Sequence, residues 1–445
     1  MSIFAVSIGM KNSKTHSVIV LLALLCCGIK VHGQDIPLFA ENNFVVEARG
    51  HVGVFWHHHF EMQKYNARYP AFEASIYQST FGKNEWEPHY NYPYIGITFY
   101  HANFGVNFEN NPDVGKALGS AYAVYPFINY PLNSNEQNQL TFKIGVGLGY
   151  LTKCFDNFTN HYNFAIGSHL NAAANLSFEY RHRFNPRLMT VASFGLTHFS
   201  NGSTKLPNYG LNTFSSALGV AYYLRSPQVN QTPLLRPVHR PFEFDKGHWI
   251  SFDVNYGIGF KNVSQTLGGD STYYYQVHDL STYLLAQITP YSRAGIGLSA
   301  VLDLSDQTLP DHIVNENGLF IVKYNAEAHK MDTLSMTTLQ MTKLNFSLCY
   351  SMTMERLSFF FELGWHLRYN EFTDLSKGNI YQKATARYQL YNNIYAYLGL
   401  MTHYGRADYL SVGLGYRFNQ KYFLNHGKNS RHSPPGLRKR RFWFL

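Results

Sequence analysis

His198 and Ser200 are the residues of this chain whose types and spacing best fit a chemical function. They are two positions apart, so on a β-strand both side chains project from one face, about 7 Å from each other. A serine hydroxyl beside an imidazole supplies a nucleophile and a general base. Asn212, on the next alternating segment, is a third polar residue on an equivalent face. The pattern predicts a nucleophilic site if these side chains lean together.

These polar residues interrupt faces that are otherwise apolar. Phe194 shares the face of His198 and Ser200, and Phe214 shares the face of Asn212. If those faces contact lipid, isolated polar groups on them are costly and tend to be functional. The alternative interpretation is that all three lie in the polar headgroup layer of a membrane, where such side chains cost little.

Segments that alternate apolar with small or polar residues recur along the chain, as in β-strands with two different faces. Four examples are residues 140–150, 162–180, 357–368 and 408–418. A soluble sandwich also alternates, but these segments reach the roughly 9–11 residues that a tilted membrane strand needs. Tyrosines at the segment ends fit an interfacial aromatic girdle. We therefore predict an all-β chain that forms an antiparallel outer-membrane β-barrel.

The number of alternating segments bounds the size of this barrel. About sixteen can be counted, and an even number fits a bacterial barrel with both termini in the periplasm. They begin near residues 44, 69, 94, 116, 140, 162, 188, 210, 249, 272, 293, 340, 357, 380, 394 and 408. A stretch with four prolines, 225–247, separates 34–224 from 248–419, with about eight segments in each half. We favour one sixteen-stranded barrel, and two tandem eight-stranded barrels are the alternative.

The two ends of the chain differ from this alternating body. Within residues 1–33, a twelve-residue apolar run follows Lys11 and Lys14 and precedes small side chains, the order of a cleaved secretory signal peptide. Residues 420–445 form a basic tail. The two ends account for the formal net charge of +9 over 445 residues, because the body between them is close to neutral. The charge therefore indicates a solvated tail, and we expect no nucleic-acid partner.

Composition excludes several other classes of protein. Only 15% of residues are charged and 16% are aromatic, which argues against a disordered chain or a coiled coil. The mean hydropathy of −0.24 is too polar for a bundle of membrane helices, and beyond the N-terminus no run of 18 apolar residues occurs. Signal cleavage would leave Cys154 and Cys349, which we expect to be unpaired thiols.

The sequence around His198 and Ser200 resembles a known family. Residues 195–202 (Gly-Leu-Thr-His-Phe-Ser-Asn-Gly) and 207–212 (Pro-Asn-Tyr-Gly-Leu-Asn) look like the signature of PagL-type lipid A 3-O-deacylases, also called acyloxyacyl hydrolases. The upstream stretches 145–153 and 166–172 are similar to long Bacteroidetes-type members. The resemblance covers residues 44–224, with a looser likeness over 394–418.

This resemblance implies an outer-membrane barrel that removes the ester-linked acyl chain at the 3-position of lipid A, without a cofactor or metal. Carried over residue by residue, Ser200 is the nucleophile and His198 its base. Asn201 helps to form the oxyanion hole, and Asn208 matches a further asparagine of the motif. The implied partners are lipid A, as part of lipopolysaccharide, and the lipids of the outer membrane.

The chain departs from the family pattern at the acid. Asn212 stands where PagL-type enzymes have a glutamate; it can orient a histidine by a hydrogen bond but cannot stabilise imidazolium by charge. This substitution leaves two alternatives open: a non-enzymatic outer-membrane pore or structural barrel with a relic site, and an esterase acting on phospholipids.

Other candidate sites are weaker. In the second half, His403 has the opposite strand parity to His198, and Gly405 stands where a serine would be needed, so we predict one site. Three consecutive histidines, 57–59, alternate faces on a strand and do not converge on a metal ion. We expect His169 and Glu179 to point inward, in a polar network that fills the barrel.

Overall fold

The computed structural model describes two thirds of the chain or more, in segments separated by gaps. The described residues are 43–57, 60–81, 84, 86–134, 137–225, 250–264, 272–308, 313–316, 319–322, 337–368, 379–403 and 406–418. The expected signal peptide (1–33), almost all of the proline-containing stretch (225–247) and the basic tail (420–445) lie outside them.

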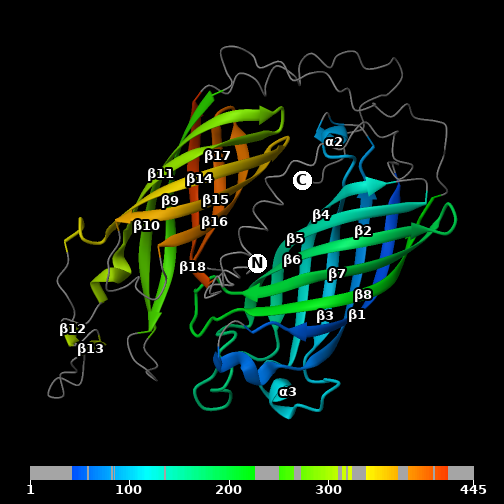
Figure 1. Cartoon of the computed structure of the whole chain (residues 1–445), viewed down its shortest axis with the longest axis horizontal. Helices are drawn as coiled ribbons and strands as arrows, with labels where there is room; N and C mark the ends of the chain where they lie inside the picture. The colour runs from blue at the N-terminus through cyan, green and yellow to red at the C-terminus, as the bar shows by residue number, and fades with distance from the viewer. Residues whose placement is uncertain are drawn as a thin grey trace, which may run out of the picture.

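Eight antiparallel strands close the first barrel (Figure 1). They are β1 (Phe44–Phe55), β2 (Arg68–Ser79), β3 (Tyr94–Asn103), β4 (Ser120–Ser134), β5 (Asn138–Leu151), β6 (Leu170–Arg183), β7 (Leu188–Ser200) and β8 (Leu211–Tyr223). Each strand pairs with its neighbour in sequence, and β8 returns to pair with β1, with Phe55 opposite Thr213. Three short helices lie in its connections: η1 (Phe60–Tyr65), α2 (Trp86–His89) and α3 (Pro112–Leu118).

Eight further strands close a second barrel in the same way. They are β9 (Ile250–Ser264), β10 (Thr272–Thr289), β11 (Ser292–Asp303), β14 (Thr342–Met354), β15 (Leu357–Arg368), β16 (Ile380–Tyr391), β17 (Ile394–His403) and β18 (Arg406–Phe418). The ring is completed by β18 pairing with β9. Between β11 and β14 lie η2 (Leu304–Thr308) and the hairpin of β12 (Ile313–Glu316) and β13 (Leu319–Val322).

The structure decides between the two architectures that the sequence left open. Two tandem eight-stranded barrels are correct, and the favoured single sixteen-stranded barrel is wrong, because β8 pairs with β1 and not with β9. Alternation cannot distinguish these cases, since a strand shows the same two faces whichever distant strand completes its ring.

The expected strand positions agree with the observed ones except at two places. The strand expected near 116 begins at Ser120, because α3 occupies Pro112–Leu118. The strand expected near 162 begins at Leu170. The alternation over 162–169 belongs to a loop in which Asn163 and Ile166 are buried. The spacing of apolar residues there results from packing of the loop and does not indicate a strand.

Polar side chains fill the barrels and apolar side chains cover them. In the first barrel, Glu179 is fully buried, accepts hydrogen bonds from Asn129 (2.6 Å) and Arg181 (2.6 Å), and pairs with Arg49 (2.6 Å). Glu179 therefore lies inside, as predicted. His169 does not: it is exposed in the β5–β6 loop and stacks on Tyr150.

The second barrel has an equivalent interior. Asp253 accepts two hydrogen bonds from Arg417 (both 2.8 Å) and one from Arg387 (3.1 Å), and Lys383 pairs with Asp279 (2.6 Å). Side chains fill the inside of a barrel of this size. Outward residues such as Leu148 and Leu218 are exposed instead.

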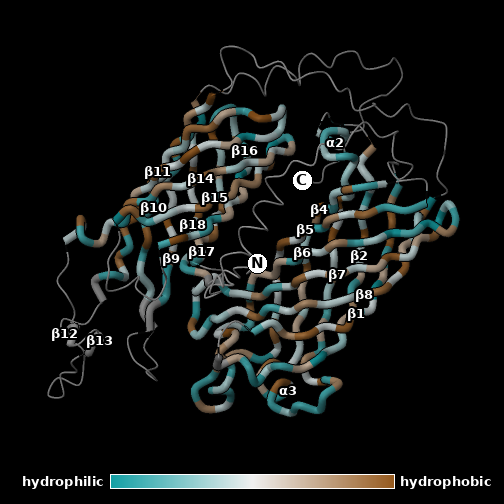
Figure 2. Tube along the Cα trace, viewed as in Figure 1, coloured by the Kyte–Doolittle hydropathy of each residue, from teal (hydrophilic) through white to brown (hydrophobic). Residues whose placement is uncertain are grey.

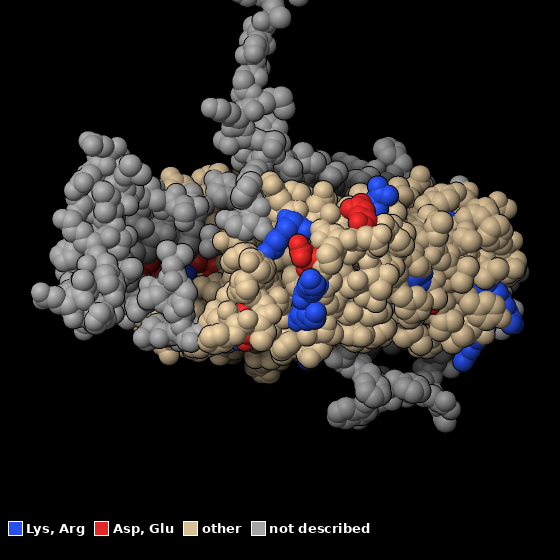
Figure 3. Space-filling model, turned by 90° about the horizontal axis from the view of Figure 1, so that it is seen from below, with Lys and Arg blue, Asp and Glu red and all other residues tan. Residues whose placement is uncertain are grey.

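This inside-out arrangement is what a membrane barrel requires. Hydropathy alternates along the strands of both barrels (Figure 2), and charged side chains occupy only a small part of the face shown in Figure 3. Among the described residues, no helix is long and apolar enough to cross a membrane.

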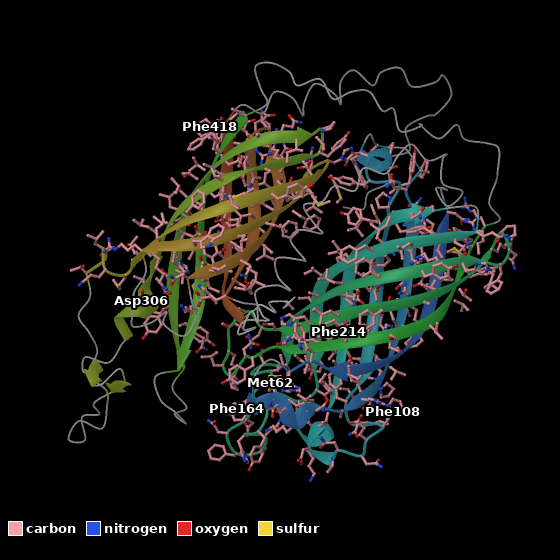
Figure 4. The ribbon with its side chains drawn as sticks, in the orientation of Figure 1. Met62, Phe108, Phe164, Phe214, Asp306 and Phe418 are labelled. Carbon is pink, nitrogen blue, oxygen red and sulfur yellow. The ribbon has the colours of Figure 1, made fainter. Side chains whose placement is uncertain are left out.

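The barrels lie side by side, and the ends that hold their first and last strand termini are on the same side of the molecule (Figure 1). We call the end with the first and last strand termini, where Phe418 lies (Figure 4), the terminal end, and the opposite end the loop end. At the terminal end, the long β2–β3 connection carries α2, and Trp86 and Ile128 form one buried cluster with Met354 of the second barrel. This connection is longer than a hairpin turn because it docks the second barrel.

Candidate active site

The register of β7 and β8 brings the predicted residues together at the loop end. His198 is directly opposite Asn212, and Leu196 is opposite Phe214. Thr197 and Phe199 are buried in the barrel, so His198 and Ser200 lie on the outward face, as their spacing predicts. The three polar residues thus occupy one outward patch at the end of two neighbouring strands.

The His198 ring is oriented by Asn212. Nδ1 of His198 lies 2.6 Å from Oδ1 of Asn212. An amide oxygen only accepts, so Nδ1 carries the proton and Nε2 keeps a lone pair, which is the form that a general base needs. Gly210 makes room for the ring: its φ is +78°, and a Cβ there would lie 2.8 Å from Cε1 of His198. Any other residue at position 210 would be strained and would push the imidazole away.

The Ser200 hydroxyl is surrounded by donors. Its Oγ accepts a hydrogen bond from Nδ2 of Asn208 (2.9 Å) and a second from the backbone N–H of Gly202 (3.2 Å). Within the described segment 137–225, no hydrogen bond joins Oγ to His198. The hydroxyl proton remains available to Nε2, and such catalytic contacts commonly tighten only when substrate binds.

Asn201 has a different place from the one that the resemblance implies. Its Nδ2 donates to Oγ of Ser168 (3.0 Å) and to the carbonyl of Lys205 (2.7 Å), so the side chain braces two loops and does not point at Ser200. Its backbone N–H donates to Oδ1 of Asn208 (3.3 Å), which holds that amide against Ser200. The donors beside Ser200 are therefore Asn208 and the Gly202 backbone.

Sequence reasoning missed Gly202 and Gly210 as parts of the site. Both have positive φ, +63° and +78°. Both glycines belong to the motif: Gly202 follows Ser200-Asn201, and Gly210 stands between Tyr209 and Leu211. Their roles depend on backbone geometry that spacing does not reveal.

An aromatic surface adjoins the site on the side of the barrel wall. The rings of Phe194 and Phe214 are stacked with centroids 5.8 Å apart, and Trp56 packs on Phe214 at 5.3 Å. Phe214 lies on the wall next to the loop end, where Met62 and Phe164 mark the loops (Figure 4). Phe194 and Trp56 are about half exposed. This surface is apolar, outward-facing and continuous with His198 through Leu196.

The weaker candidates are not part of this site. His403 points into the second barrel, where its Nε2 lies 2.8 Å from Nε2 of His366. Gly405, His58 and His59 lie outside the described residues. Within the described ranges, no three His, Cys, Asp or Glu side chains are grouped so that they could hold a metal ion.

Comparison with known proteins gives matches to two family models. The model for lipid A 3-O-deacylase (PagL) matches residues 71–221, and the model for the acyloxyacyl hydrolase C-terminal domain matches residues 250–420. The first match spans β2 to β8 and the second spans the second barrel. No curated protein matches the chain.

The matches among solved structures include the following three. Neisserial surface protein A is 10% identical, over 40% of this chain and 96% of that chain, with a TM-score of 0.28. The outer membrane enzyme PagL is 12% identical, over 39% and 97%, also with a TM-score of 0.28. The siderophore receptor PirA from Pseudomonas aeruginosa is 9% identical, over 85% and 81%, with a TM-score of 0.23.

The family rests on the two sequence models. Each matches one of the two barrels, and together they span most of the chain. The chain belongs to the PagL family of lipid A 3-O-deacylases, a family of acyloxyacyl hydrolases.

Proposed function

We propose that this protein is an outer-membrane serine esterase that removes the 3-O-linked acyl chain of lipid A. The observation that carries the proposal is the outward patch itself: a serine surrounded by donors, a histidine whose Nε2 keeps its lone pair and an aromatic surface, all on the outward face of the first barrel. Lipid A has ester-linked acyl chains inside the membrane and a polar sugar at the membrane surface. Its ester carbonyl groups therefore lie near the boundary, at the depth where β7 ends.

In the proposed reaction, Nε2 of His198 takes the proton of Ser200 as Oγ attacks the ester carbonyl carbon. We assign stabilisation of the negative charge that develops on the carbonyl oxygen to the Gly202 N–H and Nδ2 of Asn208, which donate to Oγ in the free protein and would turn to that neighbouring oxygen. The tetrahedral intermediate breaks its bond to the sugar oxygen, which receives the proton from His198. Water then attacks the acyl-enzyme by the same route and releases the fatty acid.

Asn212 serves as the orienting residue in this scheme. It fixes the tautomer of His198, as the asparagine does in Cys-His-Asn sites, but adds no charge. Phe194, Phe214 and Trp56 supply the surface along which the departing acyl chain lies. The signal peptide expected in residues 1–33 would deliver the protein, and the terminal end of both barrels would face the periplasm.

Mass spectrometry of lipid A tests the proposal in cells that express the full chain or Ser200→Ala. Loss of one acyl chain is expected with the wild type only. Heat-dependent mobility on gels would show that both barrels are folded in the membrane. Unchanged lipid A in the presence of folded wild type would contradict the proposal, and loss of acyl chains from phospholipids instead would identify a phospholipid esterase.

The structure also bears on the pore alternative. The interiors of both barrels are crossed by buried ion pairs, such as Arg181 with Glu179 and Arg417 with Asp253. Conductance measurements in planar bilayers should therefore show no open channel.

A further inference from the structure

The first residues of the loop that follows Ser200 are buried although they lie on the outside of the first barrel. Ser200, Asn201 and Ser203 are 5–7% exposed. A strand end on the outer wall of an isolated barrel would be open to its surroundings. The cover over Gly202 and Ser203 comes from the loop end of the second barrel.

Three hydrogen bonds and one apolar contact join this loop to the second barrel. Oγ of Ser203 donates to the carbonyl of Ala407 (2.7 Å). The backbone N–H of Asn262 donates to the carbonyl of Ser203 (3.3 Å), and Nδ2 of Asn262 donates to the carbonyl of Thr204 (3.2 Å).

The apolar contact lies beside these hydrogen bonds. The Leu410 side chain is so close to Gly202 that a Cβ at position 202 would lie 2.5 Å from its Cδ1. The loop is thus in contact with two strands of the second barrel, at the end of β9 and at the start of β18.

The backbone of this loop has an unfavourable conformation that these contacts stabilise. Gly202 and Ser203 both have left-handed φ values, +63° and +64°. A serine in this region is strained and persists only where its surroundings hold it. These two residues turn the chain directly after the Gly202 N–H, which donates to Oγ of Ser200. The second barrel therefore contacts the turn that anchors this donor.

A second contact at the terminal end keeps the barrels from rocking apart. The Tyr90 hydroxyl donates to the carbonyls of Tyr291 (3.3 Å) and Thr353 (3.4 Å). Burial raises the pKa of Tyr90, so this hydroxyl stays a neutral donor. Contacts at both ends of two rigid barrels fix their relative position, which a single contact would not do.

We propose that the second barrel is a positioning module for the nucleophile loop of the first, and that Asn262 and Leu410 are positioning residues of the esterase. This inference rests on the proposed function. It gives the second barrel, which has no outward Ser-His pair in its described residues, a role in the same reaction: it holds the Gly202 N–H and Ser200 in register with His198.

The test compares kcat and KM of the full-length wild type with those of Asn262→Ala, Leu410→Ala and the double variant, on purified lipid A. We expect kcat to fall about tenfold to a hundredfold in the double variant, because small displacements of catalytic groups are costly. KM should change little, since the aromatic surface belongs to the first barrel. Labelling of Ser200 by a fluorophosphonate probe should slow by a similar factor.

Leu414→Ala is the matched control. Leu414 is the same residue type on the same strand and the same outward face, but it is 58% exposed and lies four residues further along the strand from Leu410. Its variant should keep wild-type kcat and wild-type labelling. Heat-dependent mobility on gels should show all variants folded.

The outcomes separate this inference from the proposed function. Folded interface variants that keep wild-type kcat and labelling would overturn the positioning role and leave the esterase intact. A wild type that cleaves no lipid A but labels at Ser200 would overturn the proposed substrate, and the variants' labelling rates would still decide the positioning role. A wild type that neither cleaves nor labels would overturn both.

Discussion

The two barrels have the same number of strands and the same inside-out polarity, but among the described residues only the first carries a His-Ser pair on its outward face. His198 of β7 faces outward beside Asn212, whereas His403 of β17 is buried inside the second barrel and contacts His366. Because side chains alternate along a strand, a shift by one position decides between a membrane-facing imidazole and an internal one. Strand parity therefore separates the outward histidine, which we propose as the general base, from the one inside the second barrel.

The interiors of the two barrels contain different buried ion pairs. The first barrel is filled by arginine–glutamate pairs around Glu179, and the second by aspartates paired with lysine or arginine, such as Asp253 and Asp303. Different residues thus meet the same requirement, which is to satisfy buried charge across eight strands. The barrels are interchangeable as scaffolds, and their outward strand ends distinguish their roles.

Replacing the two histidines gives the largest contrast between the barrels. His198→Ala should lower kcat for lipid A deacylation by about 10²–10⁴-fold, because the general base is lost. His403→Ala should leave kcat unchanged and lower the stability of the second barrel by about 1–3 kcal/mol, since its buried partner His366 loses a hydrogen bond. Parallel kinetics and heat-induced mobility shifts measure both; equal losses of kcat would break the comparison.

Removing one buried carboxylate from each barrel should affect stability in both. Glu179→Ala and Asp253→Ala each remove a buried carboxylate that pairs with two arginines, at a cost of about 3–5 kcal/mol. Urea unfolding in lipid vesicles, followed by tryptophan fluorescence, measures the loss. If only one variant is destabilised, the interiors are not equivalent.

The residue opposite His198 should set the level of activity. We expect kcat in the order Asn212→Glu, then wild type, then Asn212→Ala, with steps of about tenfold. A glutamate would add charge stabilisation of the imidazolium, and alanine would remove the partner that fixes the tautomer. Lipid A turnover by purified variants gives this order directly, and an inactive Asn212→Glu would show that the site is built around the amide.

The smallest effect is expected on the outward apolar surfaces. Phe214→Ala should raise KM for lipid A about threefold to tenfold with little change in kcat, because it removes apolar contact with an acyl chain. Val412→Ala, at an exposed outward position on the second barrel, should change neither constant. Matching effects at both positions would mean that acyl chains bind without preference for the first barrel.

Much of the fold could be predicted because alternation is a local property. The starts of β1, β7, β15, β16 and β17 follow from the pattern to the residue, and the outward placement of His198, Ser200 and Asn212 follows from parity alone. The start of β6 was missed because apolar spacing in the buried 162–169 loop imitates a strand. The closure into two rings was not favoured because pairing of β8 with β1 is a contact across the whole barrel.

The sequence by itself determined the strand faces and the outward polar patch of His198 and Ser200 at the end of β7, because side-chain direction along a strand depends only on position. Tertiary structure decided which strands close each ring, where Asn201 directs its amide and how Gly202 reaches Ser200. It also decided that Asn262 and Leu410 meet the nucleophile loop. These contacts join residues that are far apart in the chain, and their geometry depends on backbone conformation and barrel packing, which residue spacing does not encode.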